Sequence, residues 1–447
     1  MTDLAVPPQP DFTACAGIDW GNKKKHAWAL QAEGSSNIEQ GEIPHTPEAI
    51  EEWAAGLRQR FPTGRLAIAL EQSRGPLVFA LSKYEHLVLY PLHPTSAADD
   101  RKIFRPSGAK SDGPDAAMHL DMLIRHRDKL RPLNPDTAET RALPLLTEDR
   151  RQLVNERTRL SNRLGADLKS YFPQVLQWFE DPYAPVALDF LERWPTLEEL
   201  QKARPATLRK FFQEHRCRDE AKNQERLEAM RTAVVAITDF AVVTAGRAAA
   251  RAAVRLLREL GQSVREYDRQ IEALAQAHPD FAIFDSLPGA GAVLVPRLIA
   301  AFGTQPDRYQ RAAGMQQYSG IAPVTEASGQ QHWVHWRWSC PKFLRQTFHA
   351  WAAQSILHCD WAAAYSRAQR DDKKKSHHAA VRSLAYKWIR IAFRCWKDRT
   401  PYDNAPYELA LKRHRKAAPE PKQSSPFELP IQWTSCGSFQ KIALKNG

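Results

Sequence analysis

Residues 14–20 read Ala14-Cys-Ala-Gly-Ile-Asp-Trp20, a short apolar run that closes on an acid. Such a run, followed by the turn signal Gly21-Asn22, predicts a buried β-strand with Asp19 at its end. A second apolar run, Leu66-Ala-Ile-Ala-Leu-Glu71, closes on Glu71 in the same way. The two runs therefore predict a pair of carboxylates at the ends of buried strands.

The segments around these runs predict an α/β domain. Three strands separated by turn signals form an antiparallel meander, and alternating helices and strands follow. Thr46 and Pro47 have the chemistry of an N-cap and a first helical position. The expected strands are 15–20, 27–32, 38–43, 65–70 and 87–92, and the expected helices are 46–60 and 76–83. This order is typical of a ribonuclease H-like fold, which we expect for residues 1–135.

Two further acids stand where a helix is expected to begin. Asp112 and Asp115 lie three residues apart in Lys110-Ser-Asp-Gly-Pro-Asp-Ala116. With the two strand-terminal acids they predict four carboxylates at one sheet edge. Oxygen ligands suit Mg²⁺ or Mn²⁺, and two such ions roughly 3.5–4 Å apart can hold both oxygens of an in-line phosphoryl displacement. Solvated surface acids and helix caps are the alternative interpretation.

The composition excludes several classes of protein and favours a polyanionic partner. The chain has 447 residues, enough for two or three domains, and its 63 basic against 51 acidic residues give a net charge of +12. Nucleic acid is the leading partner on this ground. No apolar run is long enough to cross a bilayer and no signal-peptide pattern is present, so we expect a cytoplasmic protein. The six cysteines form no C-x-x-C pair, so they indicate reduced thiols.

The middle of the chain, residues 147–280, predicts a helical or coiled-coil region. Its longest apolar pattern with helical spacing is Ala250–Leu274, a reasonable dimer seam. Prolines break the remainder into at least two helical hairpins. Arginines alternate with acids near its start, which fits a salt-bridged face as well as a nucleic-acid surface. These arginines are Arg150, Arg151, Arg157, Arg159 and Arg163.

A third, mainly helical region is expected at residues 281–412. The stretch from Ser286 to Gly303 has the pattern of a helix-hairpin-helix element. There Gly289 and Gly291 would let a DNA phosphate approach the backbone at a helix N-terminus. A packing turn with positive φ is the alternative. Residues 413–447 are rich in Lys, Pro, Ser and Gln, which predicts a disordered tail.

Two features of the third region bear on catalysis and on nucleic-acid contact. Ser328 precedes Gly329 in an expected loop, where a serine is usually only a turn residue. Residues 330–338 predict an alternating strand whose tryptophans, Trp333, Trp336 and Trp338, could stack on bases but more often fill a core.

A basic stretch near residue 380 predicts a helix that contacts phosphates. A solvated basic helix with a tryptophan-bearing core side is the competing interpretation. The residues assigned to nucleic-acid binding here are Lys373, Lys374, Lys375, Arg382, Arg390 and Arg394.

The order of these motifs resembles that of the DEDD transposases of the insertion-sequence one-ten family, over nearly the whole chain. The resemblance implies a RuvC-like N-terminal domain, a coiled coil, and a C-terminal transposase domain with a catalytic serine. It assigns metal binding and catalysis to Asp19, Glu71, Asp112 and Asp115. It assigns the nucleophile that forms a covalent phosphoserine link to DNA to Ser328, with Ser319 and Ser339 as nearby alternatives.

The same resemblance implies the cofactor and the partners. The cofactor would be Mg²⁺ or Mn²⁺, and the partners donor DNA, target DNA and a non-coding bridge RNA. The protein would act as a homodimer or homotetramer associated with the nucleoid of a prokaryotic cell. The residues alone leave open a metal-dependent nuclease such as a junction resolvase, an actin-like sugar kinase, or a protein that only binds. The second Asp-x-Gly loop of such a kinase is absent from the sequence.

Overall fold

The computed structural model describes residues 11–20, 25–71, 75–92 and 112–409, with the side chain of Asp112 left out. The chain divides into two compact units, Met1–Asp136 and Thr137–Gly447. The predicted tail at 413–447 lies outside the described residues. No helix in the part of the chain that the structure describes is long and apolar enough to cross a membrane.

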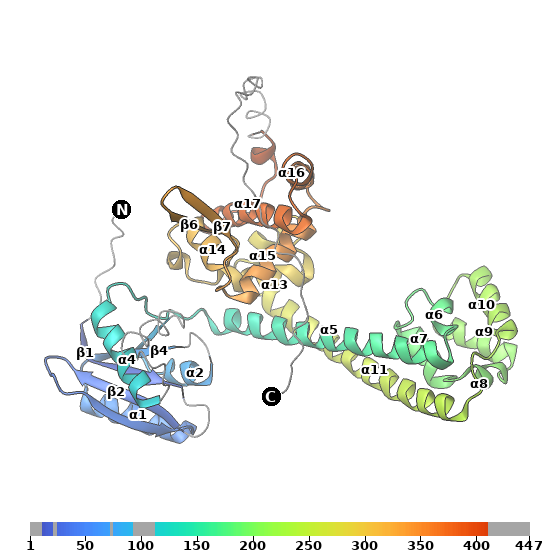
Figure 1. Cartoon of the computed structure of the whole chain (residues 1–447), viewed down its shortest axis with the longest axis horizontal. Helices are drawn as coiled ribbons and strands as arrows, with labels where there is room; N and C mark the ends of the chain where they lie inside the picture. The colour runs from blue at the N-terminus through green and yellow to red at the C-terminus, as the bar shows by residue number, and fades with distance from the viewer. Residues whose placement is uncertain (1–10, 21–24, 72–74, 93–111, 410–447) are drawn as a thin grey trace. The chain divides into compact units, whose positions relative to one another are not determined.

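The first unit is built on a five-stranded mixed sheet with the order β3-β2-β1-β4-β5 (Figure 1). The first three strands form the predicted antiparallel meander, and β4 and β5 continue parallel to β1. The predicted α/β class of this region is therefore confirmed. The strands are β1 (Phe12–Asp19), β2 (Lys25–Ala32), β3 (Glu39–Pro44), β4 (Arg65–Leu70) and β5 (Leu87–Pro91).

Helices cover both faces of this sheet. On one face, α1 (Pro47–Arg60) and α2 (Pro76–Leu81) share a core with alternate residues of the strands. On the other face, methionines and leucines of α4 (Asp112–His126) pack against β1, β4 and β5. The predicted start of α1 is confirmed, because the Thr46 side chain accepts a hydrogen bond from the Ala49 amide at 3.3 Å.

In the second unit, two long antiparallel helices connect two hydrophobic cores (Figure 1). They are α5 (Ala138–Tyr171) and α11 (Phe240–Gln276). Leu143 of α5 shares a core with Ile271 of α11, whereas Leu164 shares the other with Val254. The helical region was expected to begin at residue 147, but α5 already begins at Ala138 and contains Pro144. Much of the apolar face of α11, which was considered as a dimer seam, therefore packs against other helices of the same chain.

Three of the five arginines at the start of the middle region form salt bridges, which was one of the two interpretations of this stretch. Arg150 donates to Asp268 at 2.5 Å, and Arg151 and Arg159 pair with glutamates three residues earlier on α5. These three guanidinium groups are engaged by carboxylates of the protein itself. They are accordingly poor candidates for a nucleic-acid surface.

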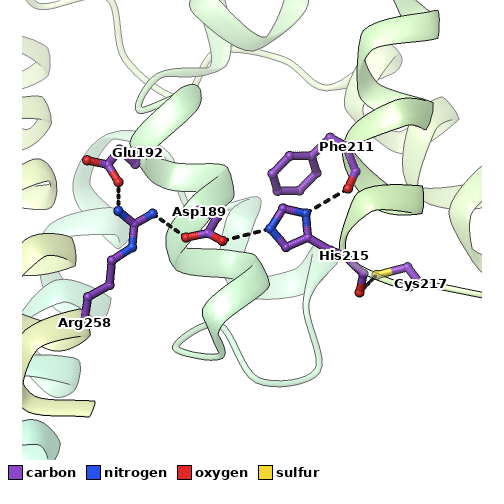
Figure 2. Close-up of polar contacts among 6 residues, drawn as sticks. All are labelled: Asp189, Glu192, Phe211, His215, Cys217 and Arg258. Atoms are coloured by element: carbon purple, nitrogen blue, oxygen red, sulfur yellow. Dashed lines mark hydrogen bonds and ion pairs between the residues drawn. The ribbon is translucent and has the colours of Figure 1, made fainter. Parts of the chain in front are cut away.

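Short helices cover the core that contains Leu164 and Val254, and polar contacts connect these helices to α11 (Figure 2). Arg258 pairs with Asp189 and Glu192, and His215 contacts Asp189 and the Phe211 carbonyl, both at 2.8 Å. Burial opposes a charge on His215, but these two acceptors outweigh it and the pKa of the imidazole is raised. The short helices are α6 (Val175–Trp178), α7 (Pro185–Arg193), α8 (Leu197–Gln201), α9 (Pro205–Glu214) and α10 (Glu220–Thr232).

The remaining core of the second unit is mainly helical and rich in tryptophan. Trp351, Trp388 and Trp396 are all fully buried in it. A two-stranded hairpin of β6 (Val324–Ser328) and β7 (Gln331–His335) is exposed along nearly its whole length. The helices are α12 (Phe281–Asp285), α13 (Gly291–Phe302), η1 (Pro306–Arg308), α14 (Ala312–Tyr318), α15 (Lys342–Ser355), α16 (Asp360–Asp371) and α17 (His377–Lys397).

Candidate active site

Two of the four predicted carboxylates stand side by side at the sheet edge. Strands β1 and β4 are parallel neighbours, and their register places Ile18 opposite Leu70. The next residue in each segment is an acid: Asp19 is the last residue of β1, and Glu71 is the first residue after β4. Because neighbouring strands are about 4.8 Å apart, the two backbones hold these acids within reach of one metal ion.

Helix α4 brings a third carboxylate to the sheet. Asp115 lies in its first turn and is only 1% exposed, and Asp19 is 5% exposed. Gly17, two residues before Asp19, makes this close approach possible. A Cβ atom at Gly17 would overlap the carbonyl oxygen of Ala116 and the amide nitrogen of Leu120. The glycine therefore lets α4 lie directly on β1, on the face toward which Asp19 alternates.

His119 is a functional candidate that sequence reasoning missed. It is fully buried one turn after Asp115, and its Nδ1 lies 3.0 Å from the carbonyl oxygen of Ile18. This contact joins α4 to the end of β1, at the residue just before Asp19. The available signal was the spacing of Asp112, Asp115 and His119, which share one helix face.

The donor set fits a hard divalent cation, although the described residues show only part of it. Asp19, Glu71 and Asp115 supply carboxylate oxygens, the ligands that Mg²⁺ and Mn²⁺ prefer. Asp112 begins α4, as predicted, but its side chain is not among those described. Within the described side chains, no three histidines, cysteines or acids form a ready metal site. The predicted four-carboxylate set thus stays a prediction.

An aromatic cluster adjoins the carboxylate edge. Trp20 packs against His26 and His45, with ring centroids 4.7 and 4.8 Å away. Trp20 also lines a small pocket together with Glu71 and Leu77. His26 is fully buried, and neither of its ring nitrogens has a hydrogen-bond partner among the described residues. Burial, and then the proximity of His45, lowers its pKa to about 4.

We expect His26 to make the first unit sensitive to acid. The unfolded chain binds a proton to this imidazole below about pH 6.5 while the folded chain resists it, so stability falls as the pH drops from 6.5 to 4. The loss is up to roughly 3 kcal/mol. Hydrogen exchange of β1 and β2 amides should show this loss in the full chain, and His26→Phe should remove most of it. An equal loss in His26→Phe and in the exposed-residue control His126→Phe would refute the assignment.

Ser328 lies at the end of a strand, and its predicted position in a loop is wrong. It is the last residue of β6 and pairs with Gln331, so the turn consists of Gly329 and Gln330 alone. Gly329 adopts φ +60°, which a two-residue hairpin turn favours. The serine side chain is therefore exposed beside the tip of the hairpin.

The two alternative serines differ sharply in access. Ser319 is fully buried, and its hydroxyl donates to the Gln316 carbonyl at 3.2 Å. It would have to leave the core to reach a phosphate. Ser339 is exposed beyond β7. Exposure thus leaves Ser328 and Ser339 as the candidates.

The two glycines of the predicted helix-hairpin-helix element have different surroundings. Gly289 has φ +73°, and a Cβ there would lie 2.9 Å from the backbone of Gln354 and Ser355. The packing-turn interpretation therefore applies to Gly289. Gly291 has φ +52° and open space around it at the start of α13. Only the second glycine is placed to admit a ligand.

The predicted basic helix is shorter than its basic sequence. Lys373, Lys374 and Lys375 precede α17 rather than lying on it, because the chain turns with Lys374 at φ +51°. On the helix, Arg382 is half-buried, Arg390 is exposed, and Arg394 pairs with Asp398 at 3.3 Å. The predicted phosphate-contacting surface is thus formed by the loop before α17 and by arginines that lie at multiples of four residues along the helix.

Comparisons with known proteins agree with the arrangement of these motifs. Residues 16–173 match a model of DEDD transposases, described as "Transposase", and residues 282–369 match the "Transposase IS116/IS110/IS902 family". A Streptomyces coelicolor protein that carries the name of mini-circle transposase for IS117 is 26% identical, with 88% of this chain and 96% of that protein aligned. The insertion element IS110 43.6 kDa protein of the same organism is 23% identical over 88% and 96%.

Proposed function

Because the chain belongs to the IS110 family of transposases, we propose that it cuts and rejoins insertion-sequence DNA through metal-bound carboxylates and a phosphoserine intermediate. One observation supports the role of the carboxylates: Asp19 ends β1 and Glu71 directly follows β4, its parallel neighbour, on the sheet that α4 covers with the buried Asp115. The match to DEDD transposases implies a ribonuclease H-like fold and a divalent metal in this region. Asp112, at the start of the same helix, completes the proposed set.

The protein's own residues would prepare the phosphate and the nucleophile. Bound to the carboxylates, Mg²⁺ or Mn²⁺ would polarise the scissile phosphate as a Lewis acid. Ser328 Oγ attacks the phosphorus in line as the bond to the leaving deoxyribose oxygen breaks. The serine proton passes to a base at the site, and the leaving oxygen takes up a proton. The phosphoserine conserves the ester, so a second DNA hydroxyl can rejoin it without external energy.

The proposed partners extend beyond one chain and one DNA. We propose donor and target DNA, a bridge RNA that pairs with both, and a dimer or tetramer in which carboxylates of one subunit serve the serine of another. The net charge of +12 supports polyanionic partners. The sheet core around Ile68, the core around Leu164 and the core around Trp388 support a division into catalytic, helical and serine-bearing regions; the last of these cores also takes in Leu143, Ile271 and Ala275 from the two long helices.

Ser328→Ala should abolish the covalent protein–DNA adduct while DNA binding persists. The reason is that alanine removes the nucleophile from an exposed position without disturbing a core. The adduct is measured on denaturing gels from cells that carry the gene with its native flanking DNA. Ser339→Ala is the matched control and should retain the adduct. An adduct that survives in Ser328→Ala would disprove this role, and cut DNA without any adduct would favour the metal-dependent nuclease.

A further inference from the structure

The β6–β7 hairpin presents large aromatic side chains to solvent. Trp333 on β7 is 48% exposed, and Trp338, three residues beyond the strand, is 81% exposed. The expectation that these tryptophans fill a core is wrong for both. An isolated two-stranded hairpin is marginally stable in water, so a hairpin that exposes such side chains is suited to binding a partner.

The base of the same hairpin carries a cluster of cations. Two guanidinium groups contact the Trp336 ring, with Arg382 at 4.0 Å and Arg345 at 5.2 Å from its centroid. Within the described part of the chain, neither arginine pairs with a carboxylate. His349 lies one helical turn after Arg345 on α15, with its ring centroid 5.6 Å from that of His378 on α17. Burial, and then the proximity of His378, lowers the pKa of His349, so this ring adds a polar edge rather than a charge to the cluster.

Two lysines extend this cluster, Lys375 in the loop before α17 and Lys387 on α17 itself. Lys375 donates to Gln369 at 2.7 Å and to Ser383 at 3.2 Å, and Lys387 lies 4.0 Å above the Tyr365 ring. Burial lowers the pKa of both ammonium groups, and neighbouring cations such as Lys373 lower it further. The protein thus gathers positive charges that repel one another. An anion that bound there would relieve this repulsion. We call the cluster the hairpin-base patch: Trp336, Arg345, His349, Lys375, Arg382 and Lys387.

We propose that the hairpin-base patch and the exposed Trp333 and Trp338 form a binding site for an unpaired stretch of nucleic acid. Phosphates contact the patch, and bases stack on the two tryptophans. Cations that follow a backbone, interleaved with aromatic rings that bases can stack on, are the features of single-strand recognition. A paired duplex keeps its bases stacked inside and offers no free face to these rings.

Ser328 pairs across the hairpin with Gln331, two residues from Trp333. On the proposed function, the bound strand is therefore the one presented to the serine. An unstacked base next to the attacked phosphate would fix the register of that strand. The site thus deepens the proposed function by naming unpaired nucleotides as its immediate ligand.

The test measures binding of the full chain to three labelled probes of equal length: oligothymidylate, oligouridylate and a DNA duplex. Trp333→Ala and Trp338→Ala should each weaken binding of the single strands by about tenfold or more and leave duplex binding unchanged. Arg382→Gln should weaken all three and lessen the salt dependence. Phe240→Ala, an exposed aromatic on α11, and Lys210→Gln, an exposed cation on α9, are the matched controls.

The outcomes separate this site from the proposed chemistry. Tighter binding of oligothymidylate identifies the ligand as DNA, and tighter binding of oligouridylate identifies it as RNA. Equal single-strand affinity in wild type and both tryptophan variants would overturn the site, as would equal losses on single strand and duplex. If the tryptophan effect holds but wild type forms no covalent adduct, the serine chemistry fails while the binding site stands.

Discussion

Asp115→Asn is expected to reduce metal-dependent DNA cleavage at least roughly a thousandfold, because a metal-held carboxylate supplies several kcal/mol and each 1.4 kcal/mol is a factor of ten. Asparagine keeps the size of this buried side chain but loses the charge that holds the cation. DNA binding should persist, since Asp115 is 1% exposed and most of the affinity for DNA is expected to come from cations that contact phosphates elsewhere on the chain. The measurement is the single-turnover cleavage rate across a Mg²⁺ or Mn²⁺ titration.

Asp121→Asn is the matched control for this experiment. Asp121 lies on the same helix, but its carboxylate pairs with Arg125 at 2.7 Å, away from the buried face. Cleavage by this variant should stay near the wild-type rate. Wild-type cleavage by Asp115→Asn, or equal losses in both variants, would remove Asp115 from the metal site.

Gly17→Ala is expected to destabilise the first unit by about 3 kcal/mol, the upper part of the range for overpacking a core. The new methyl group would overlap the backbone of α4 at Ala116 and Leu120, and backbone cannot rotate away as a side chain can. The helix must move off β1, and Asp115 moves with it. Hydrogen exchange of β1 and α4 amides in the full chain measures the loss, and cleavage should fall even where the unit remains folded.

Gly56→Ala, in α1 of the same unit, is the control and is expected to raise stability rather than lower it. A Cβ at Gly56 meets nothing within 4 Å, and the residue lies inside α1. Alanine there should stabilise the helix by about 0.5–1 kcal/mol, because it restricts the unfolded chain and favours the helix. Similar effects at positions 17 and 56 would show that contact between α4 and β1 is not what Gly17 provides.

Local sequence patterns predicted the framework of the first unit well. Asp19 ends β1 and Glu71 directly follows β4, close to what was expected, since apolar runs of strand length with flanking turn residues leave few other structures. Thr46 caps α1, because capping chemistry is local, and α4 begins at Asp112. The contact that aligns Asp115 with the sheet was not predictable in this way. It depends on Gly17 and His119 meeting across about a hundred residues of sequence.

The second unit shows where local patterns fail. Alternating tryptophans predicted a strand with a buried side, but among the residues that the structure describes β7 is exposed on both faces and β6 nearly so. Ser328 was expected in a loop because Gly329 signals a turn, yet a two-residue turn leaves the preceding serine in the strand. Basic composition also placed three lysines on α17 that belong to the loop before it. The exposure of the hairpin depends on tertiary packing, whereas the length of its turn and the first residue of α17 are local details that the sequence pattern does not resolve.

The most direct test is to digest the wild-type protein after reaction with its native flanking DNA and to identify, by mass spectrometry, the peptide that carries the nucleotide. We expect the nucleotide on the peptide that contains Ser328, with the same peptide unmodified in Asp115→Asn. That result would join the carboxylate site and the serine in one reaction. Cleaved DNA with free ends and no modified peptide, or a nucleotide on Ser339, would contradict it.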